Sequence, residues 1–160
     1  MPKLQINKEF KAVVAVGNFL ENKQQVLKNN CMMVQQFSYC CERKLNEAGE
    51  IYTSMKPVIL KFSIRVSSPQ HTKPFYQALN AYQSQNYSFV FNGIFDTAKQ
   101  LKSFDDGMVV NAYVVAVKED CDTSPLAEHE SRQIILTVTL QVCAVTYLGS
   151  DSNLSCTFIK

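Results

Sequence analysis

The stretch of sequence that decides the fold is residues 134–148, which read IILTVTLQVCAVTYL. Apolar residues occupy every even-numbered position from Ile134 to Leu148 except Thr146. The odd-numbered positions are mixed, and they hold Ile135, Thr137, Thr139, Gln141, Cys143, Val145 and Tyr147. Because successive side chains of a strand point to opposite faces, this pattern predicts one strand with an apolar face and a half-polar face. At fifteen residues, it is far longer than the usual strand of about five or six.

Alternation of apolar and polar residues marks several other strands. The clearest is VILKFSIRV, in which Lys61, Ser63 and Arg65 point outward and the inward positions are Val58, Leu60, Phe62, Ile64 and Val66. The segment MVVNAYVVAV, residues 108–117, predicts a buried strand. Further strands are predicted at residues 10–16, 31–43 and 87–95, with a weaker one at 98–104.

One segment has the period of a helix instead. In KPFYQALNAYQSQ, the residues that fall on a single helical face are Phe75, Ala78, Leu79 and Tyr82. Thr72 is a candidate N-cap, and Pro74 is acceptable in a first helical turn. The pattern predicts a short amphipathic helix at about residues 73–83.

The order of these elements indicates a mainly β protein. Strands follow one another without the regular helical crossovers of a parallel sheet, which favours an antiparallel β-barrel or split barrel of two packed sheets with one helix at an opening. Residues 44–54 are polar, contain Gly49 and predict an extended, protruding loop. We expect a single domain over residues 1–160, with residues 150–160 as a C-terminal extension.

Composition narrows the range of functions. The net charge is only +2, from sixteen basic and fourteen acidic residues, so nothing in the charge favours nucleic acid or an anionic membrane. A hydrophobic content of 46% argues against disorder. The N-terminus lacks the apolar core of a signal peptide, and no run is apolar enough for a membrane helix. These features predict a cytoplasmic protein, or one that leaves the cytoplasm without a leader.

Catalytic and metal-binding motifs are not apparent in the sequence. The histidines, His71 and His129, are expected in exposed positions, and the six cysteines lack the paired spacing of a zinc site and fit free thiols. The acidic group Glu119, Asp120 and Asp122 lacks the glycine that calcium loops usually carry. We therefore predict no catalytic residues, no metal and no cofactor.

The second faces of the strands are too apolar for an ordinary surface. Residues in this class include Ile59, Ile135, Val145, Tyr147, Met32 and Val34. Large exposed apolar stripes are rare on monomers. A second protein chain is the simplest cover, and rings or stacked tubes are the symmetric solutions for a head-to-tail interface.

The series of elements resembles a known family over about residues 9–149. The first strand is EFKAVVAVGN, followed by the hairpin NKQQVLKN, the strand QQFSYCCER, the loop LNEAGEIYTS and the strand VILKFSIRV. The helix PFYQALNAYQ, the strand NYSFVF and the closing pair MVVNAYVVAVKEDCD and RQIILTVTLQVCAVTYLG complete it. This order is similar to the Hcp (TssD) tube protein of type VI secretion in its Bacteroidetes form, and to the phage-tail-tube barrel.

The resemblance implies a structural role without catalysis. Members of this family form hexameric rings that stack into a hollow tube, and a contracting sheath propels the tube with a spike and effectors into target cells. The resemblance implies export through this apparatus without a signal peptide. It assigns the second face of the long strand to the lumen or a subunit interface, with candidates Ile135, Thr137, Thr139, Gln141, Val145 and Tyr147. It assigns contacts with a neighbouring subunit or ring to the protruding loop, with candidates Leu45, Asn46, Glu47, Gly49, Ile51 and Tyr52.

Two alternative functions remain open at this point. One is a small-ligand-binding barrel, in which the interior is a pocket rather than a packed core. The other is an enzyme that uses a reactive cysteine or the acids at 119–122. Ligand-dependent stabilisation of a monomer would favour the first, and an unusually fast thiol would favour the second.

Overall fold

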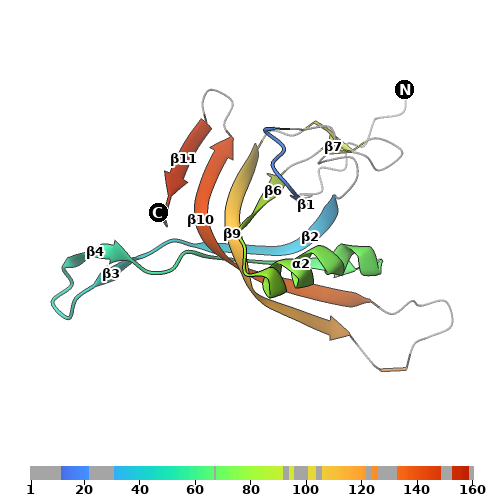
Figure 1. The fold of residues 1–160 in the computed structure, drawn as a ribbon, viewed down its shortest axis with the longest axis horizontal. Helices are drawn as coiled ribbons and strands as arrows, with labels where there is room; N and C mark the ends of the chain where they lie inside the picture. The colour runs from blue at the N-terminus through green and yellow to red at the C-terminus, as the bar shows by residue number, and fades with distance from the viewer. Residues whose placement is uncertain are drawn as a thin grey trace, which may run out of the picture.

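The computed structural model describes residues 12–21, 31–66, 68–91, 94–95, 101–103, 106–121, 124–125, 133–148 and 153–158. Figure 1 shows the arrangement of the elements. The strands are β1 (Ala12–Val16), β2 (Met32–Cys40), β3 (Arg43–Leu45), β4 (Ile51–Met55), β5 (Ile59–Val66), β6 (Gln85–Phe91), β7 (Ile94–Phe95), β8 (Leu101–Ser103), β9 (Asp106–Cys121), β10 (Ile134–Leu148) and β11 (Asn153–Thr157). The helix in the described residues is α2 (Pro69–Ala81).

A closed antiparallel barrel organises these strands. The order in the main sheet is β11-β10-β5-β2-β1-β6-β9, and β9 also pairs with β10. The six strands from β10 to β9 therefore close on themselves, while β11 lies outside the barrel on the edge of β10. The mainly β barrel with one short helix, which the sequence predicted, is confirmed.

The length of β10 follows from its partners. One edge of β10 pairs with β9 from Ile134 to Leu148. The other edge is shared end to end, since β5 pairs with Ile134–Gln141 and β11 pairs with Ala144–Leu148. A strand of ordinary length could not hold both partners, so β10 must run the full height of the barrel wall and beyond it (Figure 1).

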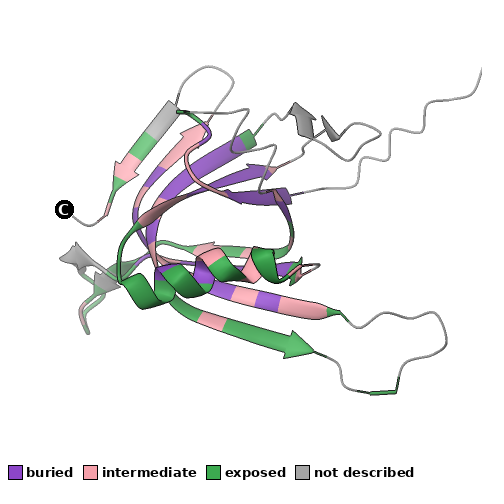
Figure 2. Cartoon of the chain, turned by 45° about the vertical axis from the view of Figure 1, so that its right-hand side comes forward, coloured by how far each residue is buried: buried purple, intermediate pink, exposed green. Residues whose placement is uncertain are grey.

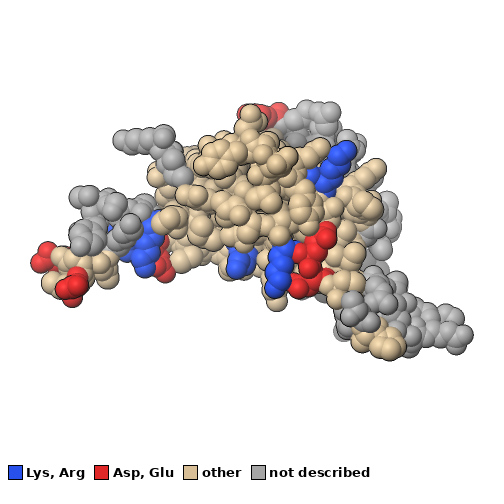
Figure 3. Space-filling view, turned by 60° about the horizontal axis from the view of Figure 1, so that its bottom comes forward, with Lys and Arg blue, Asp and Glu red and all other residues tan. Residues whose placement is uncertain are grey.

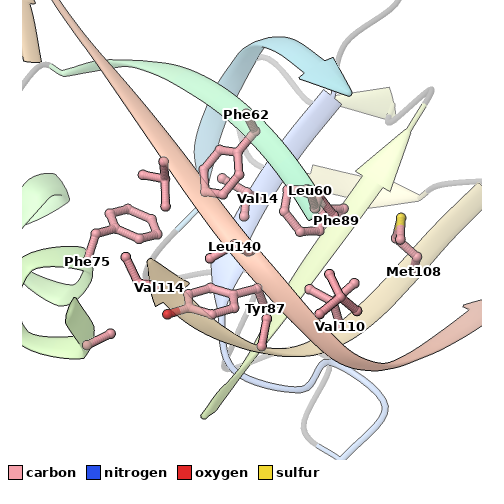
Figure 4. Close-up of a cluster of buried hydrophobic side chains, with 14 of the residues drawn as sticks. Val14, Leu60, Phe62, Phe75, Tyr87, Phe89, Met108, Val110, Val114 and Leu140 are labelled. Carbon is pink, nitrogen blue, oxygen red and sulfur yellow. The ribbon is translucent and has the colours of Figure 1, made fainter. Parts of the chain in front are cut away.

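Large apolar side chains fill the barrel interior. The predicted inward residues Val58, Leu60, Phe62 and Ile64 are buried, as are Tyr87 and Phe89 from β6. Aromatic rings meet edge to face, with centroids 5.2 Å apart for Phe62 and Phe89 and 5.7 Å apart for Phe62 and Phe75. Offset and edge-to-face contacts of this kind are the favoured aromatic geometries. Figure 4 shows how side chains of this buried cluster come together from several strands and from α2.

Helix α2 closes one side of this core. Phe75 and Ala78 are buried, and the Phe75 ring stacks on Tyr87 at 6.0 Å (Figure 4). The helix begins at Pro69 rather than near residue 73, because Ser68 is the N-cap and its Oγ accepts a hydrogen bond from the Gln70 amide at 3.3 Å. The prediction of Thr72 as the cap was wrong, since its hydroxyl donates to the Pro69 carbonyl at 2.9 Å.

The buried face of α2 is narrower than the sequence pattern predicted. Leu79 is 38% exposed and Tyr82 is 86% exposed. Tyr82 is the C-cap residue in a left-handed conformation, with φ of 53°, where the chain turns toward β6. Its ring therefore points away from the core that Phe75 enters.

A buried serine fixes the turn after β1 to the barrel. Ser88 Oγ accepts a hydrogen bond from the Phe19 amide at 3.0 Å and donates one to the Gly17 carbonyl at 2.7 Å. Gly17 has φ of 121°, a conformation that favours glycine. These bonds satisfy a hydroxyl that is fully buried, and they place Phe19 in the core.

Some expectations fall outside the described residues. They are the hairpin at 22–30, part of the weak strand at 98–104, His129 and Asp122. Within the described residues, no helix has the length and apolar character needed to cross a membrane.

Candidate assembly surfaces

The first candidate surface is the outer face of the sheet β2-β5-β10-β9. Ile135, Thr137, Thr139 and Gln141 of β10 point to this face, opposite the buried Leu136, Val138 and Leu140. Register places Thr137 between Ser63 and Lys118, and Thr139 between Lys61 and Ala116. Residues directly opposite in an antiparallel pair share a face. The four predicted positions of β10 therefore lie together with side chains from its neighbours.

Two candidates from the same strand do not lie on this face. Val145 is buried in the barrel core, and Tyr147 packs against the core. Their assignment to the second face was wrong, because β10 has a bulge between Val142 and Ala144 that leaves Cys143 without a register partner on β9. One extra residue in a bulge reverses which positions point inward.

The sequence does carry a signal of this reversal. Thr146 is the only polar residue among the even positions, and its hydroxyl lies 3.1 Å from that of Ser155 at an exposed site. Thr146 is a polar residue at an expected core position, five residues after Gln141, and it indicates that the inward and outward faces have exchanged between the two.

The second candidate surface is formed by two open strand edges of the same sheet. On β2, the edge away from β5 pairs with β1 only at Met32–Val34. Residues 35–40 therefore have no described strand on that edge, while β5 pairs with their other edge. On β9, the edge away from β10 pairs with β6 only over residues 106–112, which leaves 113–121 without a described strand partner. Most of this outer part of β9 is exposed (Figure 2), although Val114 is buried.

Apolar side chains gather beside the open edge of β9. We call this group the edge cluster, and its members are Tyr76, Leu79, Tyr82 and Val115, each at least 38% exposed. The rings of Tyr82 and Tyr113 are 5.8 Å apart, which joins the end of α2 to β9. Burial and the neighbouring Glu119 of β9 raise the pKa of Tyr76. An apolar group next to unpaired backbone is typical of a protein interface.

The predicted protruding loop is a β-hairpin. Residues 44–54 were predicted to form an extended, protruding loop. β3 and β4 pair here, with Leu45 opposite Ile51, and project from the barrel (Figure 1). In its turn, the Glu50 amide donates to Asn46 Oδ1 at 2.8 Å, and Gly49 has φ of +80°. At its base, Lys56 Nζ lies 3.1 Å from Glu42 Oε2.

The hairpin presents several of the predicted contact residues. Leu45, Glu47 and Gly49 are exposed, and Asn46 is half-buried in the turn. The side chains of Ile51 and Tyr52 lie outside the described residues, although their backbone belongs to β4. The hairpin therefore carries Leu45, Asn46, Glu47 and Gly49 away from the barrel on a paired backbone rather than a loose loop.

Charged groups are sparse on the outer face of the sheet. Lys61, Arg65, Lys118 and Asp120 are exposed there, and Lys118 Nζ lies 3.7 Å from Asp120 Oδ2. Figure 3 shows mostly uncharged surface with a few basic and acidic side chains across one side. A shallow hollow of about 380 Å³ opens on the face, lined by Gln36, Phe37, Ser38, Lys61, Phe62, Ser63 and Thr137.

The candidate chemical groups are dispersed over the fold. His71 lies in the first turns of α2, and Glu119 and Asp120 lie near the end of β9. Cys143 is buried at the bulge, whereas Cys40, Cys41 and Cys121 are exposed. Among the described residues, no group of three or more His, Cys, Asp or Glu side chains is arranged to hold a metal ion.

Comparisons with known proteins identify the fold. No protein-family model matches the chain, and neither does any curated protein sequence. The crystal structure of an Hcp protein aligns with a TM-score of 0.64 and 11% identity, covering 95% of this chain and 99% of that one. Hcp1 from the Escherichia coli pathovar EAEC 042 aligns with a TM-score of 0.60 and 13% identity, covering 94% and 99%.

A structure from a third source gives the same result. Hcp1 from Flavobacterium johnsoniae aligns with a TM-score of 0.55 and 14% identity, covering 92% of this chain and all of that one (100%). The alignments run over nearly the whole chain in each case. The chain therefore has the Hcp fold, and the resemblance seen in its sequence is confirmed at the level of the fold.

Proposed function

We propose that this protein is the structural subunit of a self-assembling ring that stacks into a hollow tube, in a contractile injection apparatus of the type VI secretion kind. The observation that carries the proposal is a pair of strand edges on opposite sides of one sheet that have no strand beside them among the described residues, in a chain with the Hcp fold. A long open strand edge presents unpaired N–H and C=O groups that can pair with a strand of another chain.

The direction of the strands fits head-to-tail assembly. Neighbouring strands in the series β2, β5, β10 and β9 are antiparallel, so the first and last of these four strands run in opposite directions. Rotation about an axis along the strands brings β9 of one copy beside β2 of the next, again antiparallel. Such a heterologous contact generates a closed ring when the rotation closes.

The edge cluster supports the same contact between β9 of one copy and β2 of the next. Tyr76, Leu79, Tyr82 and Val115 flank the open part of β9, where a neighbouring copy would cover them. Burial of apolar surface stabilises a contact by roughly 25 cal/mol per Å². Backbone hydrogen bonds between the two strands would lack this contribution. The exposed β3–β4 hairpin supplies a further contact with a neighbouring subunit or ring through Leu45, Asn46, Glu47 and Gly49.

In this arrangement the outer face of the sheet lines the channel. Ile135, Thr137, Thr139 and Gln141 then form part of a lining that is neither strongly apolar nor strongly charged. Val145 and Tyr147 take no part in it, since both belong to the barrel interior. The packed interior also removes support from the small-ligand-binding alternative, because Leu60, Phe62 and Leu140 fill the space a ligand would need.

Finer parts of the proposal rest on the resemblance to the Hcp family. They are a ring of six copies, contacts with a spike, a sheath and effector proteins, the absence of catalysis, and export from the cytoplasm through the apparatus. The Hcp fold supports these parts as a group, and none of them is argued from an individual side chain.

Light scattering coupled to size-exclusion chromatography, with negative-stain microscopy of the peak, tests the proposal. We expect ring-shaped particles whose proportion rises with protein concentration and whose mass corresponds to about six chains of 18.1 kDa. A monomer that persists at high concentration, with no rings in the images, would contradict it.

A further inference from the structure

Among the described residues, the outer sheet face combines positive charge that forms no ion pair with neutral polar groups. Lys61 and Arg65 are exposed on β5, and among the described residues no ion pair is formed by either. Lys118 on β9 is paired with Asp120 at 3.7 Å. Asp120 is the only acidic side chain that the register places on this face opposite β10. The described part of the face therefore carries a net positive charge.

The hollow on this face brings one of these cations together with hydrogen-bonding groups. Lys61 lines it with the hydroxyls of Ser38, Ser63 and Thr137 and the amide of Gln36. Ser63 is only 4% exposed, so its hydroxyl lies at the floor of the hollow rather than in bulk water. A cation near the buried hydroxyl of Ser63 and the half-buried Thr137 is suited to a carboxylate, since charge-assisted hydrogen bonds are stronger away from water.

We propose that this face binds an acidic segment of a partner polypeptide, with a carboxylate held at Lys61 in the hollow and further carboxylates near Arg65. The binding site exists on the single chain, but its position inside a channel rests on the proposed function. In the assembled ring, every copy would present the same cation to a partner that passes along the lining.

A polypeptide fits the face better than a nucleic acid does. Double-stranded DNA carries about one charge per 1.7 Å, whereas this face offers few cations, one of them already neutralised by Asp120. Single strands are usually held by stacking on exposed aromatic rings. In the hollow, Phe62 is buried and Phe37 is half-buried, so neither presents an open ring face.

Fluorescence anisotropy with defined probes tests the inference on the full chain. The probe is a labelled peptide of alternating Glu and Gly, compared with Ser-Gly and Lys-Gly peptides and with an oligothymidine. We expect the acidic peptide to bind more tightly than the other probes, and Lys61→Gln to weaken that binding about tenfold, as for loss of one charge-assisted contact. Lys73→Gln removes an exposed lysine on α2, off this face, and should change affinity by less than about twofold.

Several results would overturn the inference. If Lys61→Gln and Lys73→Gln lowered the affinity for the acidic peptide equally, the peptide would be attracted to positive charge in general. If the Ser-Gly peptide bound as tightly as the acidic peptide, carboxylates would not be recognised. Tighter, Lys61-dependent binding of oligothymidine would identify the partner as nucleic acid. The oligomeric state is measured in the same samples, so Lys61-dependent peptide binding by a monomer would refute ring assembly while leaving this inference intact.

Discussion

Val145 of β10 lies directly opposite Val110 of β9, and both side chains are buried in the barrel core. Ile135, ten residues earlier in the same strand, lies opposite Asp120 on the outer face. Both residues are apolar and odd-numbered in one alternating sequence. The bulge at Cys143 lies between them, so Ile135 points outward and Val145 points into the core. The difference has a direct consequence for stability.

A carboxylate should lower the free energy of unfolding far more at position 145 than at position 135. Val145→Asp buries a charge without a partner, and we expect it to lower the free energy of unfolding by at least about 3 kcal/mol or to prevent folding. Ile135→Asp keeps its charge at a half-buried outer site and should cost no more than about 1 kcal/mol. Urea denaturation followed by circular dichroism measures both, and similar losses would contradict the face assignment.

The open edge of β9 gives a test of assembly that is separate from folding. Val115→Asp places a charge within the edge cluster at a position that is 45% exposed. We expect rings to be lost while the monomer keeps its thermal unfolding midpoint, because the charge is solvated until a second copy covers it. Leu20→Asp is the matched control, since Leu20 is 47% exposed in the turn after β1, outside the edge cluster.

Light scattering distinguishes the two variants. Rings should persist in Leu20→Asp and disappear in Val115→Asp. Rings of unchanged mass and concentration dependence in Val115→Asp would exclude this part of β9 from the interface.

Removal of the Ser88 hydroxyl should loosen the turn after β1. In Ser88→Ala, the Phe19 amide loses its acceptor and the Gly17 carbonyl loses its donor. An unsatisfied buried polar group costs about 1–3 kcal/mol, and we expect destabilisation in that range. Hydrogen exchange should also be faster for the Phe19 amide, and an unchanged exchange rate would show that another group holds the turn.

Tyr87 should respond in the opposite direction. Its hydroxyl is buried and has no hydrogen-bond partner among the described residues, and burial raises the pKa of Tyr87 to about 12. Tyr87→Phe removes this polar atom and keeps the ring that stacks on Phe75. We expect the variant to be as stable as the parent or more stable by up to about 1 kcal/mol in thermal unfolding. A clear loss of stability would reveal an ordered water or another partner at the hydroxyl.

Thiol labelling should separate the cysteines by their surroundings. Burial raises the pKa of Cys31 from 9.0 to about 11, and burial also raises that of Cys143. The thiolate is the reactive form, so a rise of two pKa units lowers its population roughly a hundredfold at pH 8. In single-cysteine labelling with a maleimide, Cys31 and Cys143 should react far more slowly than the exposed Cys41. An unusually fast cysteine would revive the enzyme alternative.

The sequence by itself determined the class of the fold and most of its strands. Alternation identified the inward residues of β5 from Val58 to Ile64, because burial on one face repeats every second residue. The helical period identified Phe75 and Ala78, which enter the core. The order of these elements was also sufficient to indicate the Hcp fold, although the aligned structures share only 11–14% identity with this chain.

Only the tertiary structure decided which residues are left for a partner. The bulge at Cys143 moved Val145 inside. Thr146 at an even position indicates that the faces change, but the alternation does not say which residue forms the bulge, because that depends on how β10 pairs with β9. Pairing also turned the predicted loop at 44–54 into the β3–β4 hairpin. Which parts of β2 and β9 lack a described strand beside them depends on how far their pairing with β1 and β6 extends in the described structure, and this long-range pairing is not contained in local sequence patterns.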